Sequence, residues 1–160
     1  MARAEANGSG AIAADSDRRR ALMGVCADAT EAELESALAT LGELPAVEEL
    51  RPPQTGLVML RGRIGASGQP FNLGEAIVTR ATVRLGTGRM GFSYLLGRSH
   101  RRARLAALVD ALGQDADYHA RLEASLVAPV EARVAAEAAR VRVATAATKV
   151  EFFTLVRGED

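Results

Sequence analysis

The pattern of hydrophobic positions predicts helices in the first third of the chain. In the stretch TEAELESALATLG, leucines recur at helical spacing, at Leu34, Leu38 and Leu41. Thr30 and Glu33 form a capping-box pattern at the start of this helix, and Gly42 can end it. Before it, Asp15 or Ser16 can cap a first helix that runs to about residue 29.

The pattern changes to β-type in the middle of the chain. Residues 57–64, 71–85 and 90–97 are rich in β-branched and aromatic residues and read as strands. Short glycine-containing segments at 66–70 and 86–89 separate them and read as turns. This order predicts an antiparallel meander of about three strands. The connector before it, LPAVEELRPPQTG, allows a short strand ahead of the two prolines.

Helical spacing returns after the third strand. Apolar residues recur at i, i+3, i+4 and i+7, at Leu105, Leu108, Val109 and Leu112. A second helix is expected over 115–127, and Pro129 fits the first turn of a long final helix. The last residues, VEFFTLVRGED, are β-like and could add a strand to a sheet in this chain or in another. We therefore predict an α+β fold with N-terminal helices, the meander, C-terminal helices and a terminal strand.

Length and composition set limits on the function. The 160 residues suit one α+β domain over 17–160, preceded by a disordered tail over 1–16. With 20 basic and 20 acidic residues the net charge is zero, which argues against bulk attraction to nucleic acid or membranes. Cys26 is the single cysteine, and no histidine–cysteine spacing suggests a metal site. No secretory signal or membrane-length apolar run is evident, so we expect a cytoplasmic protein.

Glu75 raises the first question of chemistry. In a strand over 71–85, alternation places this carboxylate on the apolar face. An unpaired carboxylate on a buried face is costly. We expect Glu75 to pair with Arg61 or Arg63 on the neighbouring strand, or with Arg80. An edge position or a structural ion pair is one interpretation, and a polar contact at an active site or subunit interface is the other.

The stretch GRSHRRAR, residues 97–104, places cations at the start of a helix that Ser99 can cap. The positive groups are Arg98, His100, Arg101 and Arg102. A helix N-terminus already carries about +0.5 charge, so cations there are unfavourable unless an anion is present. That anion would be a phosphate or a carboxylate of a partner. Solvated arginines are the equal alternative.

The remaining candidates favour structural roles. The three arginines at 18–20 are expected on a solvated helix face, and Cys26 in a helix core. His100 and His119 lie on separate segments without metal-ligand spacing. From these residues alone, the prediction stops at an α+β subunit with an anion site.

Three separated stretches carry a resemblance to a known family. They are TGLVMLRGRIGASGQPFNLGEAIVTRATVRL, GFSYLLGRSHRRARLAALVDAL and VEFFTLVRGED. In this order and spacing they closely resemble the PhnG family, the small G subunit of the bacterial carbon–phosphorus lyase system for phosphonate use. The resemblance covers roughly residues 17–160. Family members carry Gly-Arg after the third strand, matched by Gly97 and Arg98, and often Asp next, where this chain has Ser99.

The resemblance implies a place in a multi-subunit enzyme. Its partners would be the H, I and J subunits, helped by an ABC-type ATPase-like subunit. The complex couples an alkylphosphonate to ATP, releases adenine and yields α-D-ribose 1-phosphonate 5-triphosphate. The later radical step, with its iron–sulfur cluster and S-adenosylmethionine, belongs to the J subunit. The chain itself would bind no cofactor or metal and would hold no complete active site.

Three functions therefore remain open. The first is a structural, accessory subunit, in which Glu75 makes an ion pair or hydrogen bond at a subunit contact. In the second, Arg80, Arg98, His100 and Arg101 bind the ATP polyphosphate or the phosphonate by charge. The third, independent of the family, is a stand-alone phosphate- or anion-binding module.

Overall fold

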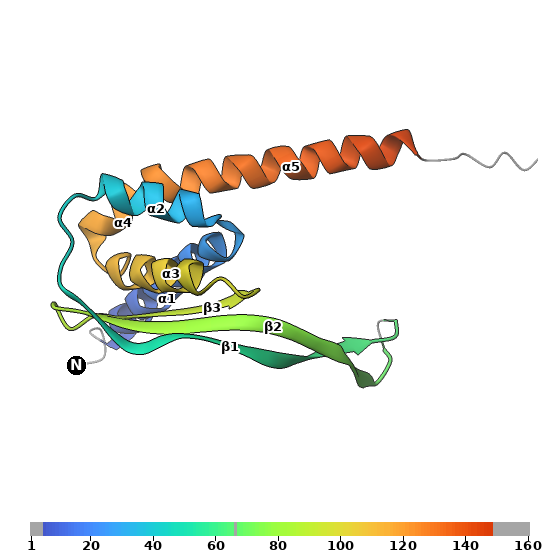
Figure 1. Ribbon diagram of the computed structural model, residues 1–160, viewed down its shortest axis with the longest axis horizontal. Helices are drawn as coiled ribbons and strands as arrows, with labels where there is room; N and C mark the ends of the chain where they lie inside the picture. The colour runs from blue at the N-terminus through green and yellow to red at the C-terminus, as the bar shows by residue number, and fades with distance from the viewer. Residues whose placement is uncertain (1–4, 66, 149–160) are drawn as a thin grey trace, which may run out of the picture.

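The computed structural model describes residues 5–65 and 67–148, and it has the predicted α+β class. The elements, in chain order, are α1 (Glu5–Asp28), α2 (Glu31–Thr40), β1 (Val47–Arg63), β2 (Pro70–Leu85), β3 (Met90–Leu96), α3 (His100–Leu112), α4 (Ala116–Leu122), the π-helical turn η1 (Glu123–Val127) and α5 (Ala128–Ala147). Figure 1 shows α2 to α5 on one side of the sheet, while α1 runs past the strands towards the N-terminus. The strand predicted for the last residues lies outside the described part of the chain.

The meander is confirmed. The three strands are antiparallel in the order β1-β2-β3, with short turns between them. Gly88 takes a φ of 87° in the second turn, which a residue without a Cβ adopts readily. The first strand begins at Val47 and therefore runs through Pro52 and Pro53. β1 lies at the edge of the sheet and has register shifts around these prolines, and both features accommodate residues that lack an N–H.

The start of the first helix differs from the prediction. We expected a tail over residues 1–16, but α1 begins at Glu5. Asp15 forms an ion pair with Arg18 one turn later instead of capping the helix. The preceding residues include several alanines and no proline, a composition that permits helix, and this explains the longer element.

The core lies between the sheet and the helices. Odd-numbered residues of β3 and of the part of β2 that pairs with it, among them Ala81, Val83 and Leu95, point towards α3 and are buried. Helix α3 is buried from Ala106 to Gly113, because it lies between the sheet and the outer helices (Figure 1). Gly91 permits the close approach of β3 and α3, since a Cβ there would lie 1.9 Å from the carbonyl oxygen of Ala107.

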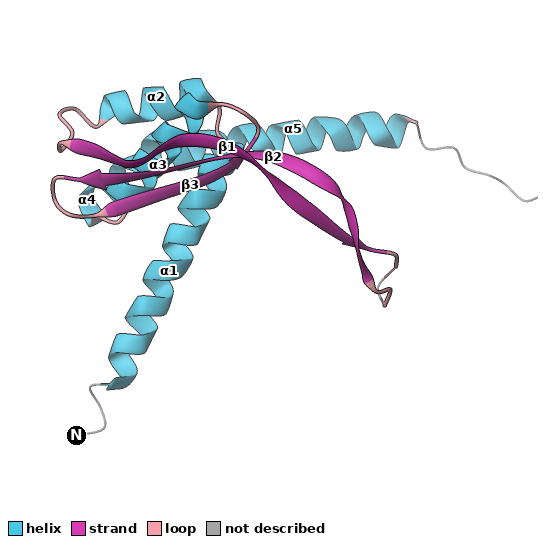
Figure 2. Ribbon diagram, turned by 60° about the horizontal axis from the view of Figure 1, so that its bottom comes forward, coloured by secondary structure: helices cyan, strands magenta, loops and turns pink. Residues whose placement is uncertain are grey.

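Besides the N-terminal part of α1, the distal hairpin and the end of α5 extend beyond this body (Figure 2). β3 pairs with β2 only over residues 78–84, so the distal parts of β1 and β2 form a two-stranded hairpin. We call residues 57–77 the arm, and Figure 2 shows it projecting past the end of β3. The distal part of α5 also projects from the body in both views. None of the described helices has the length and hydrophobicity needed to cross a bilayer.

Candidate functional site

The predicted anion site at the start of α3 exists as a polar junction with α2. Ser99 caps α3, because its hydroxyl accepts a hydrogen bond from the Arg102 N–H at 3.1 Å. The same hydroxyl donates to Oε2 of Glu31 at 2.9 Å. The Nε atom of Arg101 lies 3.5 Å from Oε1 of Glu31 and also pairs with Glu35. The anion beside this helix end is thus a carboxylate of the same chain.

His100 and Arg102 contact other elements of the chain. The His100 Nε2 atom lies 2.9 Å from the Thr55 hydroxyl of β1. Thr79 continues this contact, lying 3.2 Å from the Thr55 hydroxyl and donating to the Gly97 carbonyl at 2.7 Å. Arg102 donates to the carbonyl oxygen of Ala27 at the end of α1. These contacts fix α3 to the sheet and to the α1–α2 connection.

The structure does not bring Arg80 to this junction. Arg80 is opposite Gln54 and Tyr94 in the sheet and is exposed on the face that the helices leave open. Arg98 is also exposed. Within residues 5–65 and 67–148, neither arginine has a hydrogen bond or ion pair. The six residues predicted as one anion site therefore divide into a junction and two separate, solvent-facing arginines.

Glu75 lies in the arm and is exposed in this chain, and the subunit contact predicted for it stays a prediction. Alternation was predicted correctly, because Glu75 shares its face of β2 with buried Thr79. The helices, however, do not reach this far along the strand. Arg61 is opposite Asn72 and Arg63 is opposite Pro70, and Arg80 lies on the other face. None of these arginines pairs with Glu75 among the described residues.

Asp110 is the principal buried polar group, and the sequence analysis missed it. Its side chain is 1% exposed and accepts two hydrogen bonds of 2.7 Å from Nε and a terminal nitrogen of Arg19. A third comes from the Phe92 N–H at 2.8 Å. The hydrogen bond to Asp110 raises the pKa of Arg19, whose guanidinium also lies 5.7 Å from the Phe92 ring centroid. The sequence feature that could have predicted this buried group is a carboxylate inside the apolar run ALVDAL.

Arg19 also corrects the prediction for the arginine run. Arg18 and Arg20 are exposed and pair locally with Asp15 and Asp17, as a solvated face requires. Arg19, between them, points inward and fastens α1 to α3 and β3 through Asp110.

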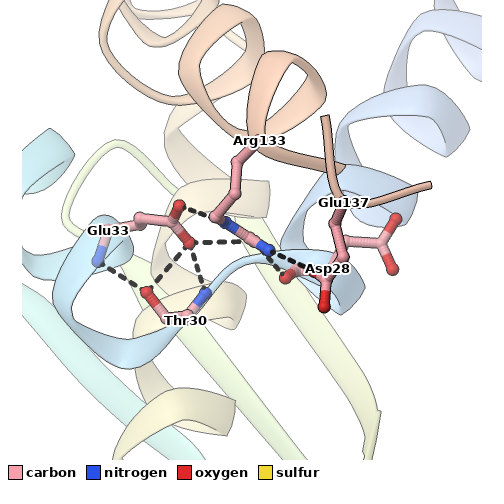
Figure 3. A network of polar contacts seen from close by, with 5 residues as sticks. All are labelled: Asp28, Thr30, Glu33, Arg133 and Glu137. Atoms are coloured by element: carbon pink, nitrogen blue, oxygen red, sulfur yellow. Dashed lines mark hydrogen bonds and ion pairs between the residues drawn. The ribbon is translucent and has the colours of Figure 1, made fainter. Parts of the chain in front are cut away.

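A second network fastens α5 to the α1–α2 connection (Figure 3). The predicted capping box is confirmed, since Glu33 N–H donates to the Thr30 hydroxyl at 3.2 Å and Thr30 N–H donates to Oε2 of Glu33 at 2.7 Å. Arg133 donates to both oxygens of Glu33, at 2.7 and 3.1 Å, and to the Asp28 carbonyl at 2.8 Å. The Arg133 hydrogen bond lowers the pKa of Glu33 to about 2.

The remaining reactive groups are Cys26 and the potential metal ligands. Cys26 is 3% exposed, and burial raises the pKa of its thiol to about 12, so it is a core residue as predicted. Within the described part of the chain, no three potential ligands among histidine, cysteine, aspartate and glutamate gather around a metal position. The polar contacts described above join secondary-structure elements to one another.

Comparison with known proteins places this scaffold in a family. Residues 17–158 match the family described as "Phosphonate metabolism protein PhnG". A curated relative from Rhizobium meliloti (strain 1021) is 54% identical over 143 residues, which are 89% of this chain and 91% of the relative. That relative is named "Alpha-D-ribose 1-methylphosphonate 5-triphosphate synthase subunit PhnG".

Proposed function

Because the chain belongs to the PhnG family, we propose that it is an interface-forming subunit of an α-D-ribose 1-methylphosphonate 5-triphosphate synthase. The observation that carries the proposal is the arm, a two-stranded hairpin that exposes large apolar side chains. Such surfaces mark interaction sites.

The arm exposes large apolar side chains on both of its strands. The exposed fractions are 62% for Leu57, 52% for Met59, 79% for Ile64 and 65% for Leu73. A two-stranded hairpin is marginally stable in water unless its side chains pack against another surface. Burial of these side chains by a partner would therefore stabilise both the arm and the complex.

Helix α5 supplies a second surface of the same kind. Its base is anchored, with Val130 buried and Arg133 bound to Glu33. Beyond this point Val134 and Val141, seven residues apart and so on one helix face, are 37% and 56% exposed. Helix propensity alone adds little stability to an isolated helix, so contact with a partner would stabilise the distal part of α5.

The partners in this proposal are the H, I and J subunits, assisted by an ABC-type ATPase-like subunit, in the cytoplasm. The complex would join an alkylphosphonate to the ribose triphosphate of ATP and release adenine. The iron–sulfur and S-adenosylmethionine chemistry would belong to the J subunit. The name of the relative supports a multi-subunit synthase. In this account the carboxylate of Glu75 meets its polar partner at a subunit contact.

A second role stays open for two residues. Arg80 and Arg98 are exposed and do not pair with any described carboxylate, so they could bind a phosphate of the substrate within the complex. Ser99 and Arg101 are already bound to Glu31, which makes the same role less suited to them. If Arg80→Ala or Arg98→Ala lowers turnover while the complex stays assembled, the residue contacts substrate. Loosened assembly would assign it to an interface.

A tagged pull-down from cells that co-express the partner subunits tests the proposal. Leu73→Glu places a charge on the exposed apolar arm and should reduce recovery of the partners without changing the melting temperature of the chain alone. Ala120→Glu makes the same charge change on exposed α4 and should leave recovery unchanged. If wild-type chain recovers none of the partner subunits, the proposed function is wrong.

A further inference from the structure

The outer edge of β1 is unpaired. β1 pairs only with β2, so one of its edges is open along Val47–Arg63 among the described residues. An unpaired edge presents backbone donors and acceptors that another strand can use. Residues 55–60, within and next to the arm, lie on this open edge. A partner strand for them rests on the proposed function.

The hydrogen bonds of β2 show which backbone N–H and C=O groups of β1 point to the open edge. Gly97 N–H donates to the Ile77 carbonyl, so odd residues of β2 direct their backbone groups towards β3. Gly86 N–H donates to the Ala46 carbonyl, so even residues direct theirs towards β1. Leu57 is opposite Ile77. The pair is thus not hydrogen-bonded, and the N–H and C=O of Leu57 point away from β2, to the open edge.

The usual protections of an edge strand are missing from this segment. Pro52 and Pro53 blunt the edge on one side, and Arg61 and Arg63 do so on the other. Between them QTGLVML contains neither proline nor charge, and Leu57 and Met59 are more than half exposed. Only residues 54–60 lack these protections, and this length suits pairing with one short strand.

The charge around the segment indicates the kind of strand. From Leu50 to Gly74 the sequence contains Arg51, Arg61 and Arg63 but no aspartate or glutamate. The neighbouring carboxylates are Glu49, before this range, and Glu75, which is opposite Met59 on β2, so arginines remain in excess around the segment. A second copy of the chain would bring like charges together, whereas a segment with carboxylates would bring opposite charges. An acidic segment of a different subunit is therefore the favoured occupant.

We propose that β1 binds an extended segment of a partner subunit as an additional strand beside residues 55–60, with carboxylates of that segment near Arg61 and Arg63. Backbone hydrogen bonds would supply affinity, and Leu57 and Met59 would contact alternate side chains of the added strand. The sheet would then continue from this chain into its partner.

A matched pair of substitutions tests strand addition in the reconstituted complex. Leu57→Ala removes the side chain but keeps the N–H, and Leu57→Pro also removes the N–H that faces the added strand. Because that N–H does not bond to β2, the two variants should have similar melting temperatures as free chains. We expect Leu57→Pro to weaken partner binding about tenfold more than Leu57→Ala. Equal affinities for the two variants would overturn the proposal.

Amide exchange gives an independent reading on the wild-type chain. In the free chain the Leu57 and Met59 amides should exchange quickly, while the Val58 and Leu60 amides, which face β2, should be protected. Complex formation should protect the first pair. Exchange that stays fast in an intact complex overturns strand addition and leaves the proposed function standing. A homodimer of the chain alone that Leu57→Pro abolishes would make a second copy the occupant and would also overturn it.

Discussion

Replacing Asp110 with alanine is the sharpest test of how the body of this protein is held together. The carboxylate is 1% exposed and accepts hydrogen bonds from Arg19 of α1 and from the Phe92 N–H of β3. The substitution removes all three bonds at once. It leaves the Phe92 N–H without its acceptor and the Arg19 guanidinium without its counter-ion.

The magnitude follows from burial. Removing one partner of a buried ion pair costs about 3–5 kcal/mol. The Arg19 side chain is 35% exposed and can be rehydrated, so the lower end, about 3 kcal/mol in free energy of unfolding, is expected. For a chain of 160 residues this corresponds to a fall in melting temperature of roughly 6–12 °C. Urea unfolding and thermal melting followed by circular dichroism measure both quantities.

Two variants serve as comparisons. Asp110→Asn keeps an oxygen for the Phe92 N–H, but it loses the charge and places an NH2 donor against the Arg19 Nε–H. It should therefore recover only part of the stability that Asp110→Ala loses. Asp17→Ala removes a carboxylate that pairs with Arg20 on the exposed side of α1 and should change stability by less than about 0.5 kcal/mol. A loss below about 1 kcal/mol for Asp110→Ala would refute the reasoning that this contact fastens α1 to the sheet.

Three further predictions concern other parts of the body. Gly91→Ala should cost about 3 kcal/mol of unfolding free energy, because the Cβ would lie 1.9 Å from the Ala107 carbonyl oxygen, whereas Gly56→Ala meets nothing within 4 Å and should fold normally. The pKa of Glu33 is lowered from 4.5 to about 2. Its contribution to the free energy of unfolding is therefore present above pH 4.5 and is lost as the pH falls towards 2. Glu33→Gln should flatten that part of the plot of stability against pH. With a thiol pKa raised from 9.0 to about 12, Cys26 should react with iodoacetamide at pH 8 roughly a thousandfold more slowly in the folded chain than in urea, and comparable rates would contradict its burial.

Local signals in the sequence predicted most helices and strands, but not the full lengths of α1 and β1. The capping residues Thr30 and Ser99 act as predicted, because a cap depends on groups within one helical turn. Period-2 alternation placed the faces of β2 correctly for the same reason. The edge strand through Pro52 and Pro53 was missed over part of its length, since propensity argues against proline whereas an edge position tolerates it.

Long-range contacts could not be predicted from these signals. Arg19 and Asp110 are 91 positions apart, and only the packing of α1 against α3 joins them. The carboxylate that meets Ser99 belongs to Glu31, 68 positions away. Glu75 was expected to be buried because alternation gives the face of a strand but not the length over which helices cover it. These distances depend on the topology of the whole chain.

Light scattering during size-exclusion chromatography tests the central claim most directly. The chain would be measured alone and after mixing with the H, I and J subunits. We expect the chain to enter a stable hetero-oligomer through the exposed arm and α5. A monodisperse monomer whose mass stays the same in the presence of all three subunits would contradict the claim that this scaffold is completed by partners.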